Sequence, residues 1–229
     1  MAMMAKHQAV KKIFDQIATK YDLIDTIISL GLDQHWRRVL VSSLGLREGM
    51  RCLDCGAGSG KVTELIYFRC GGCDVTALDI TDSMFNPELK KYVKFVVSPA
   101  ESLPFPDASF DRVSSAFLTR NLADIDRYFA EVYRVLRPGG VFVNMDIYNP
   151  TRPVISEFFS LYFYRFVPFF GNRATGSKNY TYLANTVKYF HRPSVISQKL
   201  ADRGFSVEAT DLFFGAVYLH RSVKPEGRG

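Results

Sequence analysis

Residues 54–60 read Asp54-Cys55-Gly56-Ala57-Gly58-Ser59-Gly60, and this stretch decides the fold. Apolar residues precede it at 50–53, and a pattern typical of a helix follows it at 61–68. Together they predict a strand, a tight glycine loop and a helix. Glycines at alternate positions let the backbone turn sharply and approach a ligand without a Cβ in the way. The loop therefore predicts a cofactor-binding turn.

A second carboxylate stands where a ribose would be bound. Asp79 ends the next apolar run, and a carboxylate at that point can accept hydrogen bonds from both ribose hydroxyls. A nicotinamide-binding loop would place its third glycine at position 61, which is Lys61 in this chain. An acidic residue followed by G-x-G-x-G instead resembles the S-adenosylmethionine loop of class I methyltransferases.

Length and composition fit one α/β domain. The 229 residues suffice for a well-buried core and a small appendage, and a hydrophobic fraction of 47% is ordinary. The net charge of +6 suits nucleic acid or an anionic membrane, but scattered surface lysines explain it equally well. No apolar run reaches the roughly 18–20 residues of a membrane span, and no signal-peptide core is present. We expect a cytoplasmic protein, with peripheral membrane contact left open.

The four cysteines have a spacing that imitates a zinc site. Cys52-x2-Cys55 and Cys70-x2-Cys73 are separated by fourteen residues, close to the spacing of a zinc ribbon. However, Cys52 falls in the first predicted strand and Cys55 in the glycine loop, where a metal would compete with the cofactor. We therefore expect no metal site and favour buried free thiols. A disulfide between the first two strands is the alternative.

Strands and helices alternate from residue 51 to residue 147, which predicts a doubly wound, mainly parallel sheet. With two further strands near the C-terminus, pairing as an antiparallel hairpin, the expected fold is α/β with a seven-stranded Rossmann-like sheet. We expect a single domain over 1–229. Its predicted segments are a helical cap (6–45), a cofactor-binding core (46–150), a helical aromatic insertion after strand five (151–192), and a last helix with the hairpin (193–223).

Several motifs extend the resemblance beyond the glycine loop. Two are similar to stretches of many small-molecule methyltransferases: Ala100-Glu101-x-Leu103-Pro104-Phe105-Pro106-Asp107-x-x-Phe110-Asp111 and Arg134-Val135-Leu136-Arg137-Pro138-Gly139-Gly140. Three are narrower: Tyr21-Asp22 with Ser29-x-Gly31-Leu32-x-x-x-Trp36-Arg37, Phe117-x-x-Arg120-Asn121, and Leu219-His220. Together they resemble the C-methyltransferases of ubiquinone and menaquinone biosynthesis, which methylate a prenylated quinol ring. The resemblance covers residues 10 to 223.

The resemblance implies S-adenosylmethionine as cofactor and a prenylated quinol as acceptor. The implied cofactor contacts are Asp54, Gly56, Gly58, Ser59, Gly60, Asp79, Ile80, Ala100, Glu101 and Ala116. Carbon methylation needs a base for a ring hydroxyl and a group that stabilises the developing oxyanion. On this basis His220 is the candidate base, Arg120 the oxyanion partner, Asn121 the group that orients a hydroxyl or a water, and Tyr21 a pocket wall.

Each candidate also has a structural interpretation. His220 can be a hydrogen-bonded residue of its strand, Arg120 can pair with Asp124 or Asp126 at the surface, Tyr21 can be core, and Glu101 can cap a turn. Eight aromatic side chains between positions 158 and 170 predict an apolar lid over the acceptor, with a buried core helix as the alternative.

The chain also departs from the family pattern. Pro99 stands where the family usually has Asp or Asn, which removes a side-chain acceptor for the adenine amino group but leaves the backbone N–H of Ala100. Leu118-Thr119 replaces the usual Gly-Leu after Phe117. Other small phenolic or apolar acceptors, or a binding protein that has lost catalysis, are therefore the alternatives. RNA is disfavoured because no aromatic-proline tetrad follows the fourth strand, and a homodimer is left open.

Overall fold

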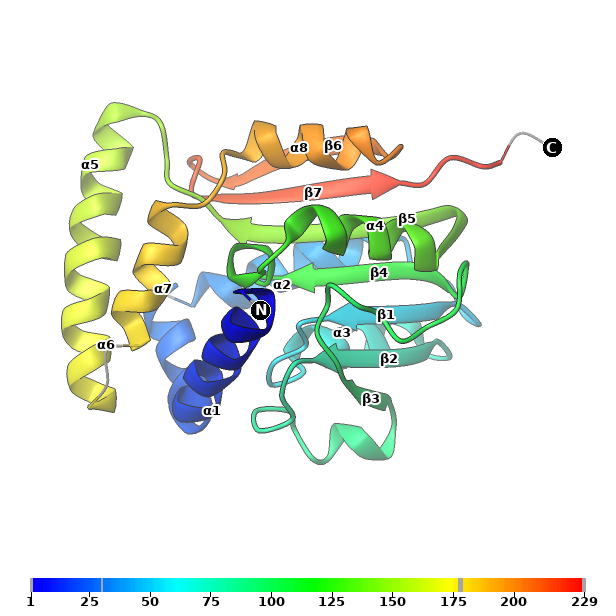
Figure 1. Ribbon diagram of the computed structural model, residues 1–229, viewed down its shortest axis with the longest axis horizontal. Helices are drawn as coiled ribbons and strands as arrows, with labels where there is room; N and C mark the ends of the chain where they lie inside the picture. Colours follow the sequence, from blue (N-terminus) through cyan, green and yellow to red (C-terminus); the bar gives the residue numbers. More distant parts are fainter. Residues whose placement is uncertain (1, 30, 177–178, 228–229) are drawn as a thin grey trace.

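The computed structural model describes residues 2–29, 31–176 and 179–227, and for residues 2, 17, 19–25, 27, 28, 174 and 175 it describes the backbone only. Within these residues the chain forms one seven-stranded sheet in the order β3-β2-β1-β4-β5-β7-β6 (Figure 1). The strands are β1 (Arg51–Cys55), β2 (Asp74–Asp79), β3 (Lys94–Val97), β4 (Phe110–Ala116), β5 (Leu136–Ile147), β6 (Ser206–Phe213) and β7 (Val217–Val223).

The strands from β3 to β5 run parallel to one another, and β7 runs in the opposite direction. Strand β7 pairs antiparallel with both β5 and β6, as the predicted C-terminal hairpin requires. The strand order changes direction between β1 and β4, and parallel sheets bind ligands at the carboxyl ends of the strands beside such a point. The predicted α/β fold is confirmed, and its topology places the glycine loop at this edge.

Helices cover both faces of the sheet. Successive residues of the central strands are therefore buried, although they point to opposite sides. The helices α2 (Leu32–Ser43) and α3 (Lys61–Cys70) pack on one face around Leu40 and Ile66. On the other face, α4 (Ile125–Val135) and α8 (Pro193–Asp202) bury Phe129 and Leu200. Each face therefore has its own apolar core.

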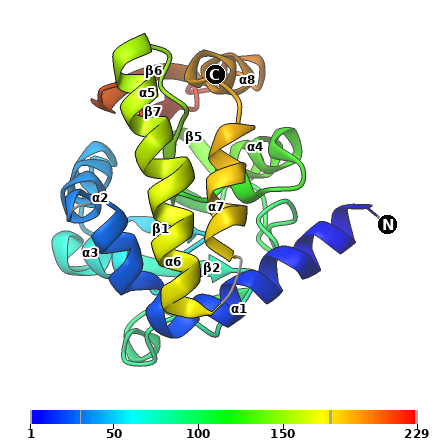
Figure 2. The same cartoon turned by 90° about the vertical axis from the view of Figure 1, so that its left-hand side faces the viewer.

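The remaining helices gather at the carboxyl edge (Figure 2). Helix α1 (Ala2–Ile28) crosses in front of the strands, while α5 (Pro153–Leu161), the π-helical turn η3 (Tyr162–Phe166) and α6 (Val167–Thr175) follow one another as a single rod. Pro168 has no N–H to complete a regular α-helical ladder, and the widened turn lies directly before it. Helix α7 (Asn179–Lys188) packs back on the rod through Tyr180, Leu183 and Val187.

The sequence also predicts three local features: Asp33 as the N-cap of the second helix, a turn at 137–140, and an interruption at Pro87 of the helix that follows the second strand. The first two need correction. Helix α2 begins at Leu32 after Gly31, whose φ is 77°, so Asp33 lies in the first turn and is not the N-cap. The predicted turn at 137–140 is the irregular beginning of β5, which pairs from Leu136 with a register shift against β4. The segment between β2 and β3 holds only the short 3-10 turn η1 (Leu89–Lys91), as the interruption at Pro87 predicts.

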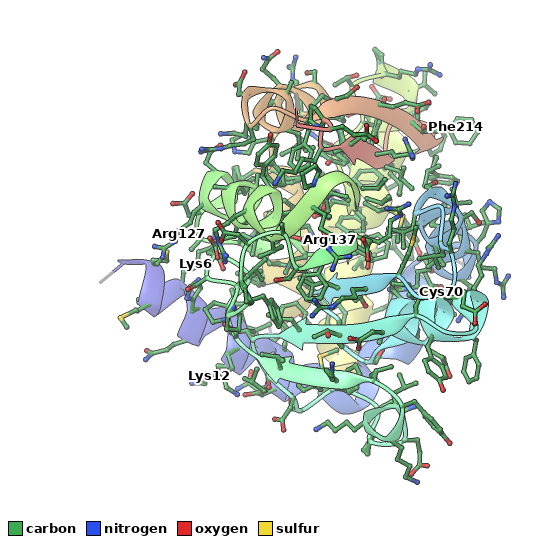
Figure 3. The ribbon with its side chains drawn as sticks, turned by 90° about the vertical axis from the view of Figure 1, so that its right-hand side faces the viewer. Lys6, Lys12, Cys70, Arg127, Arg137 and Phe214 are labelled. Atoms are coloured by element: carbon green, nitrogen blue, oxygen red, sulfur yellow. A yellow bond between two sulfur atoms is a disulfide. The ribbon has the colours of Figure 1, made fainter. Side chains whose placement is uncertain are left out.

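The cysteines divide into two kinds. Cys52 and Cys55 are buried free thiols, as expected. Cys70 and Cys73 instead form a disulfide with each other at the end of α3, so the prediction of free thiols was wrong for this pair. The alternative of a disulfide between the first two strands is also wrong. Cys70 lies at the outer edge of the molecule, away from the carboxyl ends of the strands (Figure 3).

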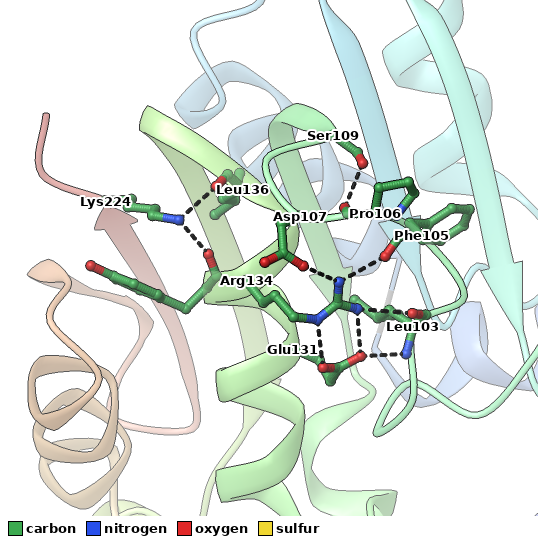
Figure 4. Close-up of polar contacts among 10 residues, drawn as sticks. Leu103, Phe105, Pro106, Asp107, Ser109, Glu131, Arg134, Leu136 and Lys224 are labelled. Carbon is green, nitrogen blue, oxygen red and sulfur yellow. Dashed lines mark hydrogen bonds and ion pairs between the residues drawn. The ribbon is translucent and has the colours of Figure 1, made fainter. Parts of the chain in front are cut away.

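The two general methyltransferase motifs contact each other through Arg134 (Figure 4). Its guanidinium donates to the carbonyls of Leu103 and Phe105 and to the carboxylates of Asp107 and Glu131, at 2.8–3.0 Å. Glu131 in turn accepts the backbone N–H of Leu103 at 2.8 Å. Helix α4 thereby holds the segment that follows Ala100 and Glu101 in place.

Candidate active site

A cavity opens beside the glycine loop at the carboxyl ends of β1, β2 and β4. The residues that line it come from five parts of the chain: His7, Val10 and Phe14 from α1; Arg37 from α2; Gly56 to Ser59 from the loop; Leu78 to Ile80, Met84 and Ser98 to Glu101 around β2 and β3; and Ala116 to Leu118, Asn121 and Leu122 after β4. Most of the predicted cofactor contacts are among them.

The glycine loop is held against the end of β2. The backbone N–H groups of Gly56 and Ala57 donate to the carbonyl of Leu78 at 2.8 and 3.1 Å. Gly56 has a φ of 68°, and a Cβ added to it would meet Leu118 at 2.9 Å. Both the conformation and the contact require glycine. A Cβ on Gly58 would meet nothing closer than 3.8 Å, so space remains above this residue for a ligand.

Asp79 links the loop to β2 and also lines the cavity. Its Oδ2 accepts the N–H of Gly58 at 2.9 Å and its Oδ1 accepts the N–H of Thr81 at 3.1 Å. Burial raises the pKa of this carboxyl despite these hydrogen bonds. Each carboxylate oxygen has a second lone pair, so Asp79 can hold the loop and still accept a hydroxyl from the cavity.

Asp54 and Gly60 lie behind the cavity and do not line it. Asp54 is 1% exposed and accepts hydrogen bonds from the hydroxyls of Thr63 at 2.7 Å and Ser114 at 2.8 Å. Gly60 is the left-handed N-cap of α3, packed under Phe85 and Leu89. In this structure both residues support the loop on the side away from the cavity. The prediction had been that they contact the cofactor directly.

Burial raises the pKa of Asp54 to about 6, against 3.8 in the unfolded chain. The folded protein thus binds this proton more tightly, so the contribution of Asp54 to stability is complete below about pH 4 and is lost as pH rises through about 6. Between pH 4 and 7 we expect the free energy of unfolding of the wild type to fall, relative to that of Asp54→Asn, by on the order of 2–3 kcal/mol. Urea unfolding across this range measures it. Exposed Asp82→Asn is the control, and parallel profiles for wild type and Asp54→Asn would contradict the expectation.

The segment after β3 closes the cavity from the side. Glu101 is 2% exposed, accepts the N–H of Ala123 at 2.8 Å and lies 3.1 Å from Nε2 of His7. Glu101 therefore connects α1 to the segment after β4 while it lines the cavity. Ala100 and Pro99 form the adjoining wall, where Pro99 presents its ring in place of a polar side chain.

Arg120 and Asn121 lie in the 3-10 turn η2 (Thr119–Asn121) directly after β4. Arg120 pairs with buried Asp146 at 2.5 Å, and its backbone N–H donates to the same carboxylate at 3.0 Å. Its guanidinium also donates to the carbonyl of Phe117 at 2.9 Å. The suggested surface pairing with Asp124 or Asp126 was wrong. Arg120 lines a neighbouring polar cleft with Tyr182, whereas Asn121 lines the cofactor cavity.

His220 is not near this cavity. It lies on β7 opposite Asn144, is 0% exposed, and its Nε2 is 3.1 Å from the carbonyl oxygen of Pro193. Burial lowers the pKa of its imidazole. The structure thus gives no support to His220 as a base and agrees with its structural interpretation. The backbone of Tyr21 belongs to α1, but its side chain lies outside the described residues.

A second cavity, of about 450 Å³, lies between α2, the α5–η3 rod and the β6–β7 hairpin. Its walls are mainly apolar: Leu32, Trp36, Phe117, Ile147, Ile155, Phe158, Phe159, Tyr162, Phe163, Phe213, Phe214, Ala216 and Val217. Its polar lining consists of Ser29 and Asp33. Phe214, which follows β6, projects from the hairpin at the edge of the molecule (Figure 3).

Phe117 lines both cavities. It follows the last residue of β4 and has a φ of 61°, which is uncommon for a bulky side chain and marks a position held by its surroundings. Its N–H donates to the carbonyl of Met145 at 2.8 Å, and the guanidinium of Arg37 lies 5.1 Å from the centre of its ring. Phe117 is therefore part of the wall of both the cofactor cavity and the apolar cavity.

Sequence reasoning missed Arg37, Phe117 and Asp33 as site residues. Arg37 and Phe117 were noted only as members of family motifs, without a role in the site, and Asp33 was noted only as a helix cap. The signal available was weak, because a charged side chain on a predicted helix is usually exposed. Here Asp33 and Arg37 are 1% and 8% exposed, and their positions follow from the packing of α2 against β4 and β5.

The residues present fit an S-adenosyl donor. The glycine backbone leaves space above Gly58, Asp79 offers a carboxylate at the end of β2, and the buried Oδ1 of Asn121 has no hydrogen-bond partner within the described residues. With the strand order of the sheet, these features define a class I S-adenosylmethionine-dependent methyltransferase.

Comparison with known proteins defines the family. The ubiE/COQ5 methyltransferase family model matches residues 2–224, so the chain belongs to this family. A ubiquinone/menaquinone biosynthesis C-methyltransferase UbiE from Hahella chejuensis is 34% identical over 230 residues, covering 96% of this chain and 92% of the relative. A demethylmenaquinone methyltransferase from Thermus thermophilus is 34% identical over 220 residues, covering 93% and 100%.

Solved structures share the fold at lower identity. A methyltransferase from Thermotoga maritima described as a possible histamine N-methyltransferase has a TM-score of 0.67 at 17% identity, covering 94% of this chain and 99% of its own. The phosphoethanolamine N-methyltransferase 2 of Haemonchus contortus, in complex with S-adenosyl-L-methionine, has a TM-score of 0.62 at 16% identity, covering 84% and 53%. At these sequence identities the similarity establishes only that the fold is shared.

Proposed function

We propose that this methyltransferase adds a methyl group to a ring carbon of a prenylated quinol, with the cofactor beside the glycine loop and the prenyl tail in the apolar cavity. The observation that carries the proposal is the pair of cavities with Phe117 in the wall of both. A polar donor and a long apolar acceptor need separate sites that meet at one point. The names of the curated relatives agree with such an acceptor.

The cofactor would be held by residues that already line the first cavity. Backbone groups of Gly58 and Ser59 and the carboxylate of Asp79 are its polar contacts, with Ile80 and Ala100 on either side. When bound, the cofactor supplies a methyl group on a sulfonium. His7, Val10 and Phe14 of α1 form one wall of this cavity, and in this proposal they limit the access of water to the bound cofactor.

The acceptor site combines apolar surface with few polar groups, as small-molecule sites usually do. Each methylene that leaves water for the apolar cavity contributes roughly 0.8 kcal/mol, which suits an isoprenoid tail. The rings of Phe159, Tyr162 and Phe163 form its wall along the rod. In this proposal Asn121 orients a polar group of the ring, and Arg120 positions Asn121 through Asp146.

The proposal also includes contact with a membrane that delivers the acceptor. The rod presents an exposed row of Phe158, Leu161, Phe166, Phe169 and Phe170 next to the side chains that line the apolar cavity. Arg152, Arg165 and Arg173 are exposed on the same insertion, and Lys178 lies outside the described residues. Aromatic rings flanked by arginines suit an anionic leaflet. Among the described residues, no helix combines the length and apolar character needed to cross a bilayer.

Turnover with defined acceptors tests the function. The purified protein is incubated with S-adenosylmethionine and one of three acceptors: a demethylmenaquinol, a demethylated ubiquinol precursor, and a catechol without a tail. Product mass, and the position of the methyl group, are then measured. Methylation of a ring carbon of either tailed quinol supports the proposal. Methylation of the catechol alone would favour another phenolic substrate, and cofactor binding by calorimetry without any turnover would favour a binding protein.

Replacing both Phe169 and Phe170 with serine is expected to weaken binding to anionic vesicles by at least about 10-fold, because each ring loses roughly 1.5–3 kcal/mol of apolar burial. Flotation on a density gradient measures the bound fraction. The matched control is Phe68→Ser, which removes an equally exposed ring from α3. Equal flotation of the double variant and the wild type would remove the membrane contact from the proposal while leaving the chemistry intact.

A further inference from the structure

Asp33 is the one carboxylate that lines the apolar cavity among the described residues. It lies in the first turn of α2 and is 1% exposed, although burial of a carboxylate among aromatic rings is unfavourable unless it is paired or used. Its neighbours in the cavity wall include Trp36 and Phe117. A group that is costly to place there, and that faces a ligand cavity, is a candidate for a role in the site.

The two oxygens of Asp33 are bonded differently. Oδ1 accepts the hydroxyl of Ser29 at 3.1 Å. Oδ2 lies 3.5 Å from Nε of Arg37 and 3.7 Å from Nζ of Lys61, but it accepts no hydrogen bond within the described residues. The two cations balance the charge of the carboxylate and fix its position, while Oδ2 keeps its capacity to accept a proton donor.

Asp33 also lies close to the cofactor cavity. Its ion-pair partner Arg37 lines that cavity, and the guanidinium of Arg37 contacts the ring of Phe117, which lines both. The carboxylate therefore stands on the acceptor side of the wall at which donor and acceptor would meet. No other described carboxylate stands in this position, because Asp79 and Glu101 line only the cofactor side.

We propose that Asp33 is the catalytic group that accepts a hydrogen bond, and then the proton, from a hydroxyl of the acceptor ring; this inference rests on the proposed function. As the O–H bond breaks, the proton moves to Oδ2 of Asp33 and the electron pair enters the ring. The activated ring carbon forms its bond to the methyl group while the S–C bond breaks and its electron pair stays on sulfur. The same carbon then loses its hydrogen as a proton to water, which restores the aromatic ring, and the ring oxygen takes back the proton from Oδ2 of Asp33.

The competing explanation is that Asp33 only balances Arg37 and Lys61. In that role Asp33 would contribute to stability, but it would not affect the affinity of the cavity for a ligand with a hydroxyl. The two roles therefore differ in one measurable quantity, the preference of the cavity for a ligand that carries a hydroxyl over the same ligand without one.

Trp36 provides a direct readout of this preference, because it is the single tryptophan of the chain and lines the apolar cavity. Quenching of its fluorescence is titrated with 2-dodecyl-1-naphthol and with the methyl ether of that naphthol, in the presence of S-adenosylhomocysteine. The wild type is expected to bind the naphthol at least about 10-fold more tightly than the ether, the range of a hydrogen bond to a charged group. Asp33→Asn is expected to bind both with similar affinity, and to lower quinol turnover by about 10²-fold or more.

Controls separate the possible failures. Asp82→Asn removes an exposed carboxylate that does not line the apolar cavity, and it should keep the wild-type ratio. If Asp33→Asn does not fold, Asp33→Glu retains the charge but displaces the oxygen, and it should also lower the ratio. An unchanged ratio in the folded Asp33 variants would overturn the inference and leave the proposed function standing. Absence of quenching by either ligand in the wild type, together with absence of quinol turnover, would overturn the proposed function itself.

Discussion

Replacing Asp146 with alanine is expected to destabilise the protein by about 3–5 kcal/mol, the usual cost of removing one partner from a buried ion pair. Asp146 is 0% exposed, and the side chain of Arg120 is 6% exposed. The carboxylate accepts the guanidinium and backbone N–H of Arg120 as well as the N–H of Ile147 at 2.8 Å. Alanine would leave a buried cation and two backbone donors without these bonds.

Urea unfolding measures the loss, and cofactor binding measured by calorimetry below the transition reports its local consequence. Because Asp146 holds the turn that carries Asn121, affinity should fall together with stability. The control is Glu88→Ala, which removes the exposed partner of Lys91 and should change the free energy of unfolding by less than about 1 kcal/mol. A similarly small change for Asp146→Ala would show that Asp146 does not hold the turn.

Arg120 also shows what the sequence could and could not predict. The motif places it directly after β4, which is correct, because the alternation of strands and helices is a local pattern. Its partner was sought nearby, at Asp124 or Asp126, but the structure pairs it with Asp146, twenty-six residues further along. Parallel pairing of β4 with β5 brings the two ends together, and only the sheet order reveals that contact.

His220 shows that a strand can be predicted correctly while the side of the sheet to which each of its residues points is not. Alternate residues of a strand point to opposite sides, so a difference of one position decides the environment. Val217 and Leu219 point toward the α2 face, and Val217 lines the apolar cavity. His220 points to the other face, where it contacts Tyr148 and the beginning of α8. Sequence alone identified the strand, but it did not separate these two faces.

The glycine loop, by contrast, was predictable almost completely. Gly56, Gly58, Asp79 and the residues after β3 line the cavity at the predicted edge, because each belongs to a strand end set by local pattern. Asp54 and Gly60, which were predicted to contact the cofactor as well, lie behind it. Phe117 was not predictable in the same way. A positive φ at a phenylalanine contradicts local propensity and exists only because β4, β5 and Arg37 surround it.

Replacing Ala216 with phenylalanine is expected to lower kcat/KM for a long-tailed quinol by about 10²- to 10³-fold. Ala216 is 2% exposed and lines the apolar cavity just before β7. A phenyl ring at this position would occupy space that the tail requires. Displacing one isoprenoid unit of five carbons from the cavity would forgo about 4 kcal/mol, or about 10³-fold in affinity.

The loss should be confined to the tail. Cofactor affinity measured by calorimetry should remain within error of the wild type, because Ala216 does not line the cofactor cavity. Turnover of a quinol that carries only a methyl group in place of the tail should fall by less than about threefold, since that acceptor forgoes little apolar burial. Ala209→Phe adds the same ring to the exposed edge strand β6 and should leave both acceptors unaffected. Equal losses for the long and short acceptors would mean that the tail does not occupy this cavity.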